Sequence, residues 1–376
     1  MSSALRVDVA VVGAGPAGAM VARELALRGA KVALIDRRQF PRSKVCGACL
    51  HPRALAALDA AGLADLVPRA GGIPLVRASI AARGRVLVSA LERPGAVLSR
   101  EAFDLALVEA ALAAGAKGMF GEAARLEPAA AGAASRALTV GERHIEASIV
   151  VAADGLGGGL LLRADRIERA PRRNARLGLG ALLPSDAADV PAGEVRLSVG
   201  RTGYLGMARV EDGRIDVAAA VVPAALEALG PAGALAQIAA EAGAFELRGL
   251  ESVPWRGTPP LWREDAPAAG WRVFAVGDAA GYVEPFSGEG LSWALVGARA
   301  LAPIAARPWS LERAREWERV RSDLLAPRQR ACGRIAMLVR QPRLVALLAG
   351  ASVYLPRATR AAVASAWGAR AQGVPS

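Results

Sequence analysis

Three apolar runs, far apart along the chain, end at glycine-marked turns. They are Val7 to Val12, Val150 to Ala153 and Val273 to Val276. Strands buried on both faces show continuous apolar runs instead of alternating ones, so these segments predict a parallel sheet. Residues 194–199 and 206–222 instead contain stretches in which apolar and polar positions alternate. That second pattern predicts strands of a mainly antiparallel sheet.

The turn after the first run carries glycines at three defined positions. Gly13 allows a tight turn, Gly15 lets the backbone approach a pyrophosphate, and Gly18 lets the next helix pack closely on the strand. The free N–H groups at the start of that helix, expected over residues 19–28, favour a negative charge. The turn therefore predicts a dinucleotide phosphate site.

An acidic residue completes this fingerprint. A second strand, expected from Lys31 to Ile35, leads directly to Asp36, eighteen residues past Gly18. A carboxylate at this position is suited to accept hydrogen bonds from ribose hydroxyls. The other two runs lead to Asp154-Gly155 and to Gly277-Asp278-Ala279-Ala280-Gly281. The order and separation of the three segments indicate FAD as the ligand.

Composition fits a globular enzyme and argues against several other classes. The chain has 376 residues, 53% of them hydrophobic, and a formal net charge of +12. This length can bury a large core, and no uncharged apolar stretch is long enough to span a bilayer. The positive charge comes from scattered arginines, so we expect no nucleic-acid partner. Because residues 1–6 lead straight into the first strand, we expect no signal peptide and a cytoplasmic protein.

The cysteines leave one alternative open. Cys46 and Cys49 have the spacing of a redox dithiol, and Cys332 stands far from them. A thiolate beside a flavin would be reasonable chemistry, although the pair does not begin a helix after a strand, as a dithiol oxidoreductase motif does. We expect neither a disulfide framework nor a metal site.

A longer stretch after Asp36 connects the chain to a known family. Residues 40–47, Phe-Pro-Arg-Ser-Lys-Val-Cys-Gly, resemble a motif of the geranylgeranyl reductase-like flavoproteins. These belong to the flavoprotein superfamily with the p-hydroxybenzoate hydroxylase fold. Arg100-Glu101-Ala102-Phe103-Asp104, Asp154-Gly155 and residues 277–290 are similar to further motifs of that family. The resemblance covers roughly residues 7–305.

The resemblance implies a set of cofactor contacts. Gly18 and Asp36 would hold the ADP half, and Cys46, Gly47 and Ala48 would offer backbone close to the flavin. Arg100 would reach the phosphate and ribityl region, and Asp278 would form a hydrogen bond with the ribityl chain. Gly290 and Leu291 would contact the pyrimidine end of the flavin. The full predicted set is Gly13, Gly15, Gly18, Asp36, Arg37, Cys46, Gly47, Ala48, Arg100, Asp154, Gly277, Asp278, Gly288, Gly290 and Leu291.

The chain departs from the family in ways that bear on the reaction. Prenyl reductases carry a Gly-Tyr-x-Trp-x-Phe-Pro strand, whereas residues 203–208 read Gly-Tyr-Leu-Gly-Met-Ala. The Trp-x-Trp signature of flavin halogenases is also absent from the sequence. We expect an NAD(P)H-dependent monooxygenase that hydroxylates an aromatic or polyketide-like substrate. The alternatives are an FAD-dependent reductase of carbon–carbon double bonds in a lipophilic substrate, and a lipid-carrier protein without flavin.

The predicted fold is α/β, with a Rossmann-like FAD-binding domain, a mainly antiparallel substrate sheet and C-terminal helices. Its FAD-binding pieces are residues 1–70, 98–164 and 265–325. The substrate sheet takes residues 71–97 and 165–264, and residues 326–376 form a helical segment.

Acid–base candidates are few, and the catalytic residues stay open. His144 is predicted at the surface and His51 at a helix start, while Tyr204 and Glu289 are possible polar groups in the pocket. Residues 344–355 are apolar between two arginines; we expect a packing helix, with contact to a membrane or a lipophilic substrate as the alternative.

Overall fold

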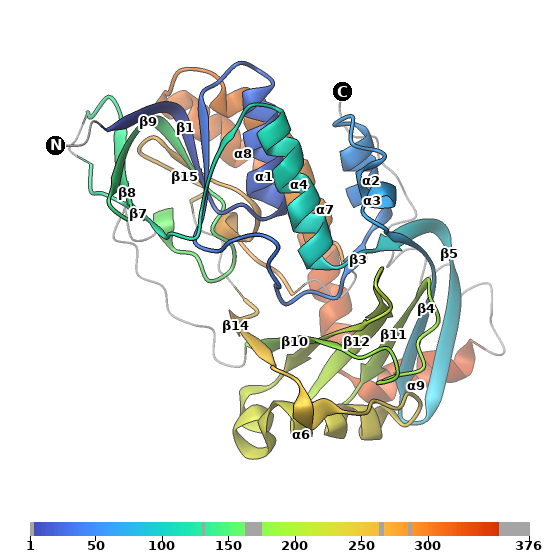
Figure 1. Ribbon diagram of the computed structural model, residues 1–376. Coiled ribbons are helices and arrows are strands. Elements are labelled where there is room, and N and C mark those ends of the chain that lie inside the picture. The colour runs from blue at the N-terminus through green and yellow to red at the C-terminus, as the bar shows by residue number, and fades with distance from the viewer. Residues whose placement is uncertain (1–3, 130–131, 162–174, 263–266, 285–287, 353–376) are drawn as a thin grey trace.

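The computed structural model describes residues 4–129, 132–161, 175–262, 267–284 and 288–352. Two sheets lie at opposite ends of the molecule (Figure 1), and helices cover both. Residues of both sheets line one cavity, and we call the region where the two sheets face each other the seam. Residues of all three glycine segments lie there.

The first sheet places the three apolar runs side by side. Its order is β15-β16-β9-β1-β2-β6, with β7 and β8 attached beside β9. β1 pairs in parallel with β2 and β9, and β16 pairs in parallel with β9, so the predicted parallel sheet is confirmed. The strands are β1 (Leu5–Val12), β2 (Val32–Asp36), β6 (Lys117–Phe120), β7 (Ala124–Leu126), β8 (Arg136–Val140), β9 (Arg143–Ala152), β15 (Ala269–Gly270) and β16 (Val273–Ala275).

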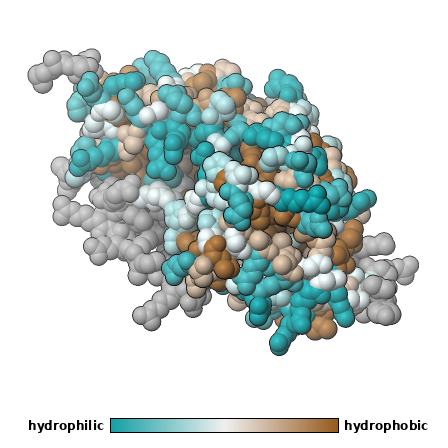
Figure 2. Space-filling view, turned by 60° about the horizontal axis from the view of Figure 1, so that its bottom comes forward, coloured by the Kyte–Doolittle hydropathy of each residue, from teal (hydrophilic) through white to brown (hydrophobic). Residues whose placement is uncertain are grey.

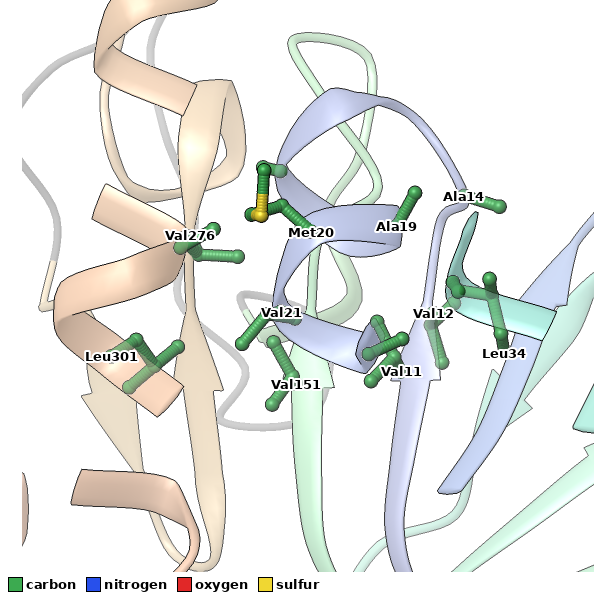
Figure 3. Packing of buried hydrophobic residues seen from close by; sticks show 14 of the residues in the cluster. Val11, Val12, Ala14, Ala19, Met20, Val21, Leu34, Val151, Val276 and Leu301 are labelled. Atoms are coloured by element: carbon green, nitrogen blue, oxygen red, sulfur yellow. The ribbon is translucent and has the colours of Figure 1, made fainter. Parts of the chain in front are cut away.

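Helix α1 (Pro16–Ala26) is the centre of this half of the core. It lies between α4 (Arg100–Ala113) and α7 (Gly290–Ala305), and its apolar side chains pack on β1 (Figure 3). Met20, Val21 and Leu25 are fully buried. Figure 3 shows Val151 of β9 and Leu301 of α7 in the same cluster as Val11 of β1. The packing therefore fixes the start of α1 relative to the ends of all three apolar strands.

The second sheet is mainly antiparallel and has two distinct faces. Its order is β14-β10-β13-β12-β11-β4-β5-β3, and among these pairs only β11 and β4 run parallel. On β13, Val217 and Ala219 face α6 (Pro223–Ala242), so Asp216, Ala218 and Ala220 face the opposite way. The strands are β3 (Cys49–Leu50), β4 (Ile73–Ala82), β5 (Arg85–Val97), β10 (Leu177–Leu183), β11 (Glu194–Val199), β12 (Gly203–Arg209), β13 (Ile215–Val221) and β14 (Arg256–Pro260).

The α/β class and the two-sheet architecture are as predicted, but two elements do not follow the predicted division of the chain. β3 belongs to the substrate sheet although it lies within residues 1–70, because Cys49 pairs with Val97 of β5. Helix α8 (Leu311–Val339) runs across residue 325. The remaining elements are α2 (Pro52–Asp59), α3 (Leu66–Arg69), η1 (Leu250–Ser252), η2 (Gly277–Ala280) and α9 (Pro342–Ala351).

Helix α9 shows the packing predicted for residues 344–355 over the part that is described, and residues 353–355 lie outside the described residues. Val345 and Ala346 are buried and the helix contacts β4 and β5, whereas Leu347 is 63% exposed. The surface at this end of the molecule is largely hydrophilic, with apolar patches between the polar side chains (Figure 2). Among the described residues, no helix combines the length and the apolar character needed to cross a membrane.

The packing of α1 on β1 allows no side chain at Gly18. A Cβ atom at this position would lie 1.7 Å from the carbonyl oxygen of Gly13. We therefore expect Gly18→Ala to force the helix away from the strand and to lower the free energy of unfolding by about 3 kcal/mol. Urea unfolding measures this loss. The control is Gly257→Ala on β14, where the nearest atom to a new Cβ is 4.0 Å away. Equal stability of the two variants would contradict the packing argument.

Candidate functional site

The three glycine segments converge at one edge of the first sheet. A Cβ at Gly13 would lie 2.3 Å from the carbonyl oxygen of Ala153, and one at Gly277 would lie 2.9 Å from the Ala17 side chain. The missing side chains thus allow the β1 turn, the end of β9 and the segment after β16 to touch. This edge is the carboxyl end of parallel strands, where open α/β sheets bind ligands.

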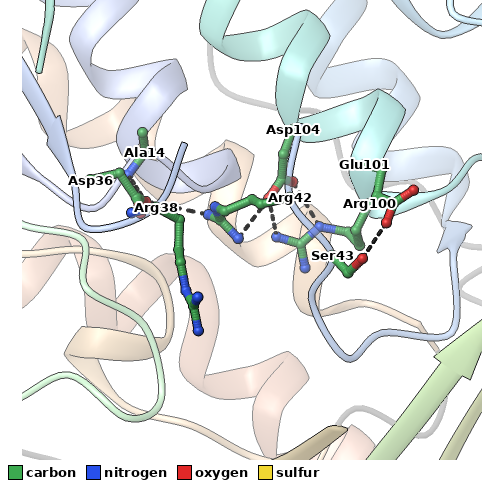
Figure 4. Close-up of polar contacts among 8 residues, drawn as sticks. All are labelled: Ala14, Asp36, Arg38, Arg42, Ser43, Arg100, Glu101 and Asp104. Carbon is green, nitrogen blue, oxygen red and sulfur yellow. Dashed lines mark hydrogen bonds and ion pairs between the residues drawn. The ribbon is translucent and has the colours of Figure 1, made fainter. Parts of the chain in front are cut away.

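Asp36 sits at the end of β2 and organises the adjacent turn. Its Oδ2 accepts a hydrogen bond of 2.9 Å from the N–H of Ala14, and its Oδ1 accepts one from the N–H of Arg38 (Figure 4). Asp36 is 8% exposed. Its location beside the glycine turn agrees with the predicted ribose contact, which stays a prediction. Arg37 points to solvent and does not line the cavity.

Arg100 lies at the first position of α4 in a buried, bidentate ion pair. Its Nε and Nη2 donate to the two carboxylate oxygens of Asp104 at 2.7 and 2.8 Å. Arg42 reaches between two acids, with its guanidinium 3.4 Å from both Asp36 and Asp104 (Figure 4). Arg100 and Asp104 are the first and last residues of the predicted Arg-x-x-Phe-Asp motif, and the spacing of four places both on one helix face.

This cluster holds more positive than negative charge. Lys44 lines the same cavity, and burial together with the nearby Arg100 lowers its pKa. Arg42 Nε is buried and makes no hydrogen bond. Buried polar groups are normally paired, so the three basic groups around Asp104 are suited to a polyanionic ligand. We call Arg42, Lys44 and Arg100 the basic floor.

The glycine turn points at the basic floor. The open side of Gly15 faces Arg42 Nη2 and Arg100 Nη2, which lie 3.5 and 3.9 Å from the position a Cβ would take. The first residue of α1 is Pro16, and no side chain caps this helix start. A pyrophosphate placed here would meet free N–H groups on one side and guanidinium groups on the other. The residues present therefore fit the diphosphate of FAD.

A second helix start faces the other end of the cavity. Gly288, Gly290 and Leu291 line it at the start of α7, where no side chain caps the backbone N–H groups. Asp278 lines it as well, from η2. Reduced flavin carries negative charge at its pyrimidine end, and a helix N-terminus stabilises an anion by about 0.3–1 kcal/mol. The predicted contact of Gly290 and Leu291 with the pyrimidine end of the flavin stays a prediction.

The two cysteines before α2 are thiols in this structure. Cys46 lines the cavity, where burial raises its pKa against a lowering effect of Arg100. Burial likewise raises the pKa of Cys49, and the neighbouring Cys46 adds to this. Both cysteines are free. Because the nucleophile in dithiol chemistry is the thiolate, this environment does not favour the redox-dithiol alternative.

Several predicted cofactor residues position the site without lining the cavity. Gly13 and Gly18 allow backbone contacts, and Ala48 has a positive φ of 52° that directs its carbonyl to the N–H of Leu98. The Asp154 carboxylate accepts hydrogen bonds from the N–H groups of Gly159 and Leu160 and so stabilises its own loop. Of the predicted set, Gly15, Cys46, Gly47, Arg100, Gly277, Asp278, Gly288, Gly290 and Leu291 line the cavity.

The substrate sheet closes the cavity with small residues. Gly178 pairs with Ala220, and Gly206 pairs with Ala218, so these four residues share one face of three adjacent strands. All four line the cavity, as do Val195 and Leu197 of β11. We call Gly178, Gly206, Ala218 and Ala220 the small-residue wall. Its small side chains leave space for a flat, apolar ligand next to the part of the cavity where the cofactor would lie.

The histidines lie where the sequence predicted them. His51 is buried at the start of α2, and its Nδ1 accepts a hydrogen bond from the N–H of Arg53. His144 is exposed on β9. Tyr204 lines the cavity, whereas Glu289 is buried beside Arg328, 3.7 Å away. Lys44, Tyr282 and Glu284 also line the cavity; sequence reasoning missed them, although Lys44 lies inside the recognised motif.

Sequence comparisons agree with this site. Residues 6–164 match the family model described as FAD binding domain. A menaquinone reductase of Mycolicibacterium smegmatis is 52% identical over 60 residues, which cover 16% of this chain and 15% of that protein. A digeranylgeranylglycerophospholipid reductase of Methanothrix thermoacetophila is 35% identical over 158 residues, or 40% of each chain. A 6-methylpretetramide 4-monooxygenase of Streptomyces rimosus is 42% identical over 82 residues, 22% of this chain and 14% of that one.

Solved structures share the fold across nearly the whole chain. A geranylgeranyl bacteriochlorophyll reductase-like protein of Thermoplasma acidophilum superimposes with a TM-score of 0.75 at 18% identity, covering 93% of this chain and 91% of the other. PqsL of P. aeruginosa in complex with 2-aminobenzoylacetate gives a TM-score of 0.71 at 21% identity, covering 91% and 98%. At these identities the likeness establishes the fold.

Loss of the Arg100 guanidinium should weaken FAD binding strongly. In Arg100→Met the Asp104 carboxylate loses its bidentate partner and the basic floor loses a charge, so we expect FAD affinity to fall about 100-fold, or ~2.7 kcal/mol. Arg100→Lys should give an intermediate loss of FAD affinity, because lysine keeps the positive charge but cannot make the two parallel hydrogen bonds of a guanidinium group. Titration calorimetry with FAD measures both. The control is Arg6→Met, whose side chain is 85% exposed; unchanged affinity in Arg100→Met would contradict the assignment.

The cysteine environment predicts slow alkylation. Because Cys46 and Cys49 have raised pKa values, iodoacetamide at pH 8 should modify them at less than about one tenth of the rate of glutathione. Both should react after unfolding in guanidinium chloride. Peptide mass spectrometry over time follows each thiol separately. Rapid modification of Cys46 in the folded protein would reveal a thiolate and revive the dithiol alternative.

Proposed function

We propose that this protein, an FAD-dependent oxidoreductase whose residues 6–164 belong to the FAD binding domain family, is a monooxygenase acting on an aromatic substrate. The observation that carries the proposal is the small-residue wall, which lines one cavity together with Lys44 and Arg100 of the basic floor and the start of α7. A planar ring lying on this wall would face the flavin across the cavity. Oxygen transfer to a ring requires such proximity.

The residues of the cavity would contribute positioning and exclusion of water. Bound FAD supplies the redox chemistry, accepting electrons from NAD(P)H and passing them to oxygen. The apolar side chains of Val195, Leu197 and Leu261 line the space next to the wall and keep it poor in water. The start of α7 would stabilise the negative charge of the reduced cofactor.

The electron donor in this proposal is NAD(P)H, which binds transiently. The sequence contains a single Gly-x-Gly-x-x-Gly fingerprint, and we assign it to the ADP half of FAD. A nicotinamide cofactor would therefore approach the flavin from solvent and leave after hydride transfer. Two of the similar proteins support an aromatic substrate: one is named as a 6-methylpretetramide 4-monooxygenase, and PqsL is solved in complex with 2-aminobenzoylacetate.

A second candidate function rests on the Cys46 thiol. Cys46 lies in the cavity as a protonated group, and reduction of a carbon–carbon double bond requires a proton as well as a hydride. The local similarity to a menaquinone reductase and to a digeranylgeranylglycerophospholipid reductase agrees with this reading. The substrate would then be an unsaturated lipophilic compound, and the small-residue wall would hold its chain.

The reaction of the reduced protein with oxygen distinguishes the two candidates. The FAD-loaded protein is reduced anaerobically and mixed with aerated buffer in a stopped-flow spectrophotometer. A transient absorption band that belongs to neither the reduced nor the oxidised flavin is expected for the monooxygenase. Direct return of the oxidised spectrum, or very slow reoxidation, would refute the monooxygenase and favour the reductase. Absence of a flavin spectrum after addition of FAD would refute both.

The wall can be tested by filling it. Ala218→Val adds two methyl groups on the cavity side of β13. We therefore expect the affinity for 2-naphthol to fall at least about tenfold. Binding of 2-naphthol is measured through the change that it causes in the flavin absorption. FAD binding should stay within about twofold, because the basic floor is untouched. Ala137→Val, at an exposed position of β8, is the matched control. Equal affinity of the two variants for 2-naphthol would contradict the role of the wall.

A further inference from the structure

Helix α9 carries apolar side chains on its outer face as well as on its packed face. Leu344, Leu347 and Leu348 are 45%, 63% and 47% exposed. Their spacing of three and four residues places them on one side of the helix, opposite the buried Val345 and Ala346. Exposed apolar side chains that gather in one place mark an interaction surface, whereas single ones do not.

The apolar side chains are concentrated in this part of the chain. Helix α9 lies beside β4 and β5, at the end of the molecule far from the first sheet (Figure 1). The last turn of α8 adds two further exposed apolar side chains, Met337 and Leu338, and only residues 340 and 341 separate it from α9. Of the thirteen large hydrophobic side chains that are exposed in the described residues, five thus lie within residues 337–348.

Basic groups border the exposed leucines, and residues 324–352 contain no aspartate or glutamate. Arg343 is exposed in the first turn of α9. The Arg85 guanidinium of β5 lies against Gly350, near the other end of the same helix. Within the part of the chain that the structure describes, neither arginine forms an ion pair. The charge beside the leucines is therefore positive and unpaired.

An anionic lipid bilayer matches both features of this face. A helix that lies in the plane of a bilayer buries its apolar side at the boundary of the acyl chains, while its arginines stay with the lipid phosphates. The negative surface potential of such a bilayer attracts exposed arginines. A second copy of the chain fits less well, because in a symmetric dimer the face would meet itself and bring like charges together.

We propose that the outer face of α9 docks on an anionic lipid bilayer, while its inner face holds the helix on the second sheet. The residues that carry this contact, which we call the docking face, are Arg85, Arg343, Leu344, Leu347 and Leu348. The inference goes beyond the proposed function and does not depend on which reaction the cavity supports.

Docking would bring the cavity close to the bilayer. Val345 and Ala346, on the inner face of α9, belong to one buried cluster with Tyr204 and Ala220. Tyr204 and Ala220 also line the cavity, so the helix separates the cavity lining from the docking face. A lipophilic substrate that is concentrated in the bilayer would then be held near the cavity.

Cosedimentation of the FAD-loaded protein with large unilamellar vesicles tests the proposal. Vesicles of phosphatidylcholine with about 30% phosphatidylglycerol should bind the protein at least about tenfold more tightly than vesicles of phosphatidylcholine alone. This binding should weaken as NaCl rises from about 50 to about 500 mM, because the attraction between exposed arginines and lipid phosphates is screened. Equal binding to the two compositions, or binding to neither, would overturn the proposal.

Leucine variants assign the contact to the docking face. The combination of Leu344→Ser, Leu347→Ser and Leu348→Ser should weaken binding to the anionic vesicles at least about tenfold. The matched control replaces three leucines on other helices by serine and should leave binding within about twofold. These leucines, 57%, 38% and 48% exposed, are Leu27, Leu112 and Leu229. Equal binding of the two triple variants would contradict the role of the leucines.

Arginine variants test the preference for anionic lipid. Arg85→Gln combined with Arg343→Gln should reduce the preference for phosphatidylglycerol to less than about threefold. Arg125→Gln combined with Arg256→Gln, at exposed positions of β7 and β14, is the control and should keep the preference. A preference that survives the loss of Arg85 and Arg343 would refute the assignment of these arginines.

Folding and self-association are monitored separately. Flavin content and melting temperature show whether each variant keeps the holoenzyme fold. Sedimentation velocity without vesicles compares the unmodified protein with the variant that lacks the three leucines of α9. The same oligomeric state in both is expected. An oligomer that dissociates in the variant would show that a second copy covers this face, and would overturn the proposal.

Discussion

The site is organised around one buried carboxylate, that of Asp104, and the basic groups gathered near it. Arg100 binds it through two hydrogen bonds, Arg42 approaches it at 3.4 Å, and Lys44 lies in the same cavity wall. Asp36, on the other side of Arg42, adds a second negative charge, so two carboxylates face three basic groups in a buried setting. The excess positive charge is balanced if a diphosphate occupies the groove. The same need for a polyanion explains why the glycine turn and the uncapped start of α1 face this point.

The strand order of the first sheet places this charge cluster beside the cavity. β16, β9 and β1 are neighbours in the first sheet, so three segments separated by more than a hundred residues end at one edge. Helix α7 begins just after the third segment and starts at the flavin end of the cavity. The second sheet lies across the seam and presents glycine and alanine where larger side chains would fill the space. The glycine segments and the small-residue wall therefore line one cavity because of strand order, not because of any single motif.

Much of this could be predicted from the sequence, because local patterns determine it. Continuous apolar runs identified the parallel strands, and the spacing from Gly13 to Asp36 identified the dinucleotide turn. The alternating stretches at 194–199 and 206–222 correspond to β11, β12 and β13. Glycine segments are informative because each one allows a close backbone approach that a Cβ would block.

The remaining features depend on contacts between distant parts of the chain. The motif predicts Asp154 as a cofactor residue, and the structure adds a role that the motif does not show, because its carboxylate accepts hydrogen bonds from the loop that follows. β3 belongs to the second sheet only through its pairing with β5, and α8 crosses a predicted boundary. The buried ion pair between Arg176 and Glu284 joins residues more than a hundred positions apart, and no local pattern marks it. Sequence reasoning finds the residues that a turn requires and misses those that only packing brings together.

The most direct test of the account is a comparison of FAD with FMN as ligands for the flavin-free protein at two salt concentrations. If the glycine turn and the basic floor hold a diphosphate inside the protein, FAD should bind at one equivalent and about 100-fold more tightly than FMN. Its affinity should change by less than about threefold between 50 and 500 mM NaCl, since buried charges are screened little. Equal binding of the two flavins, or an FAD affinity that collapses with salt, would contradict the account.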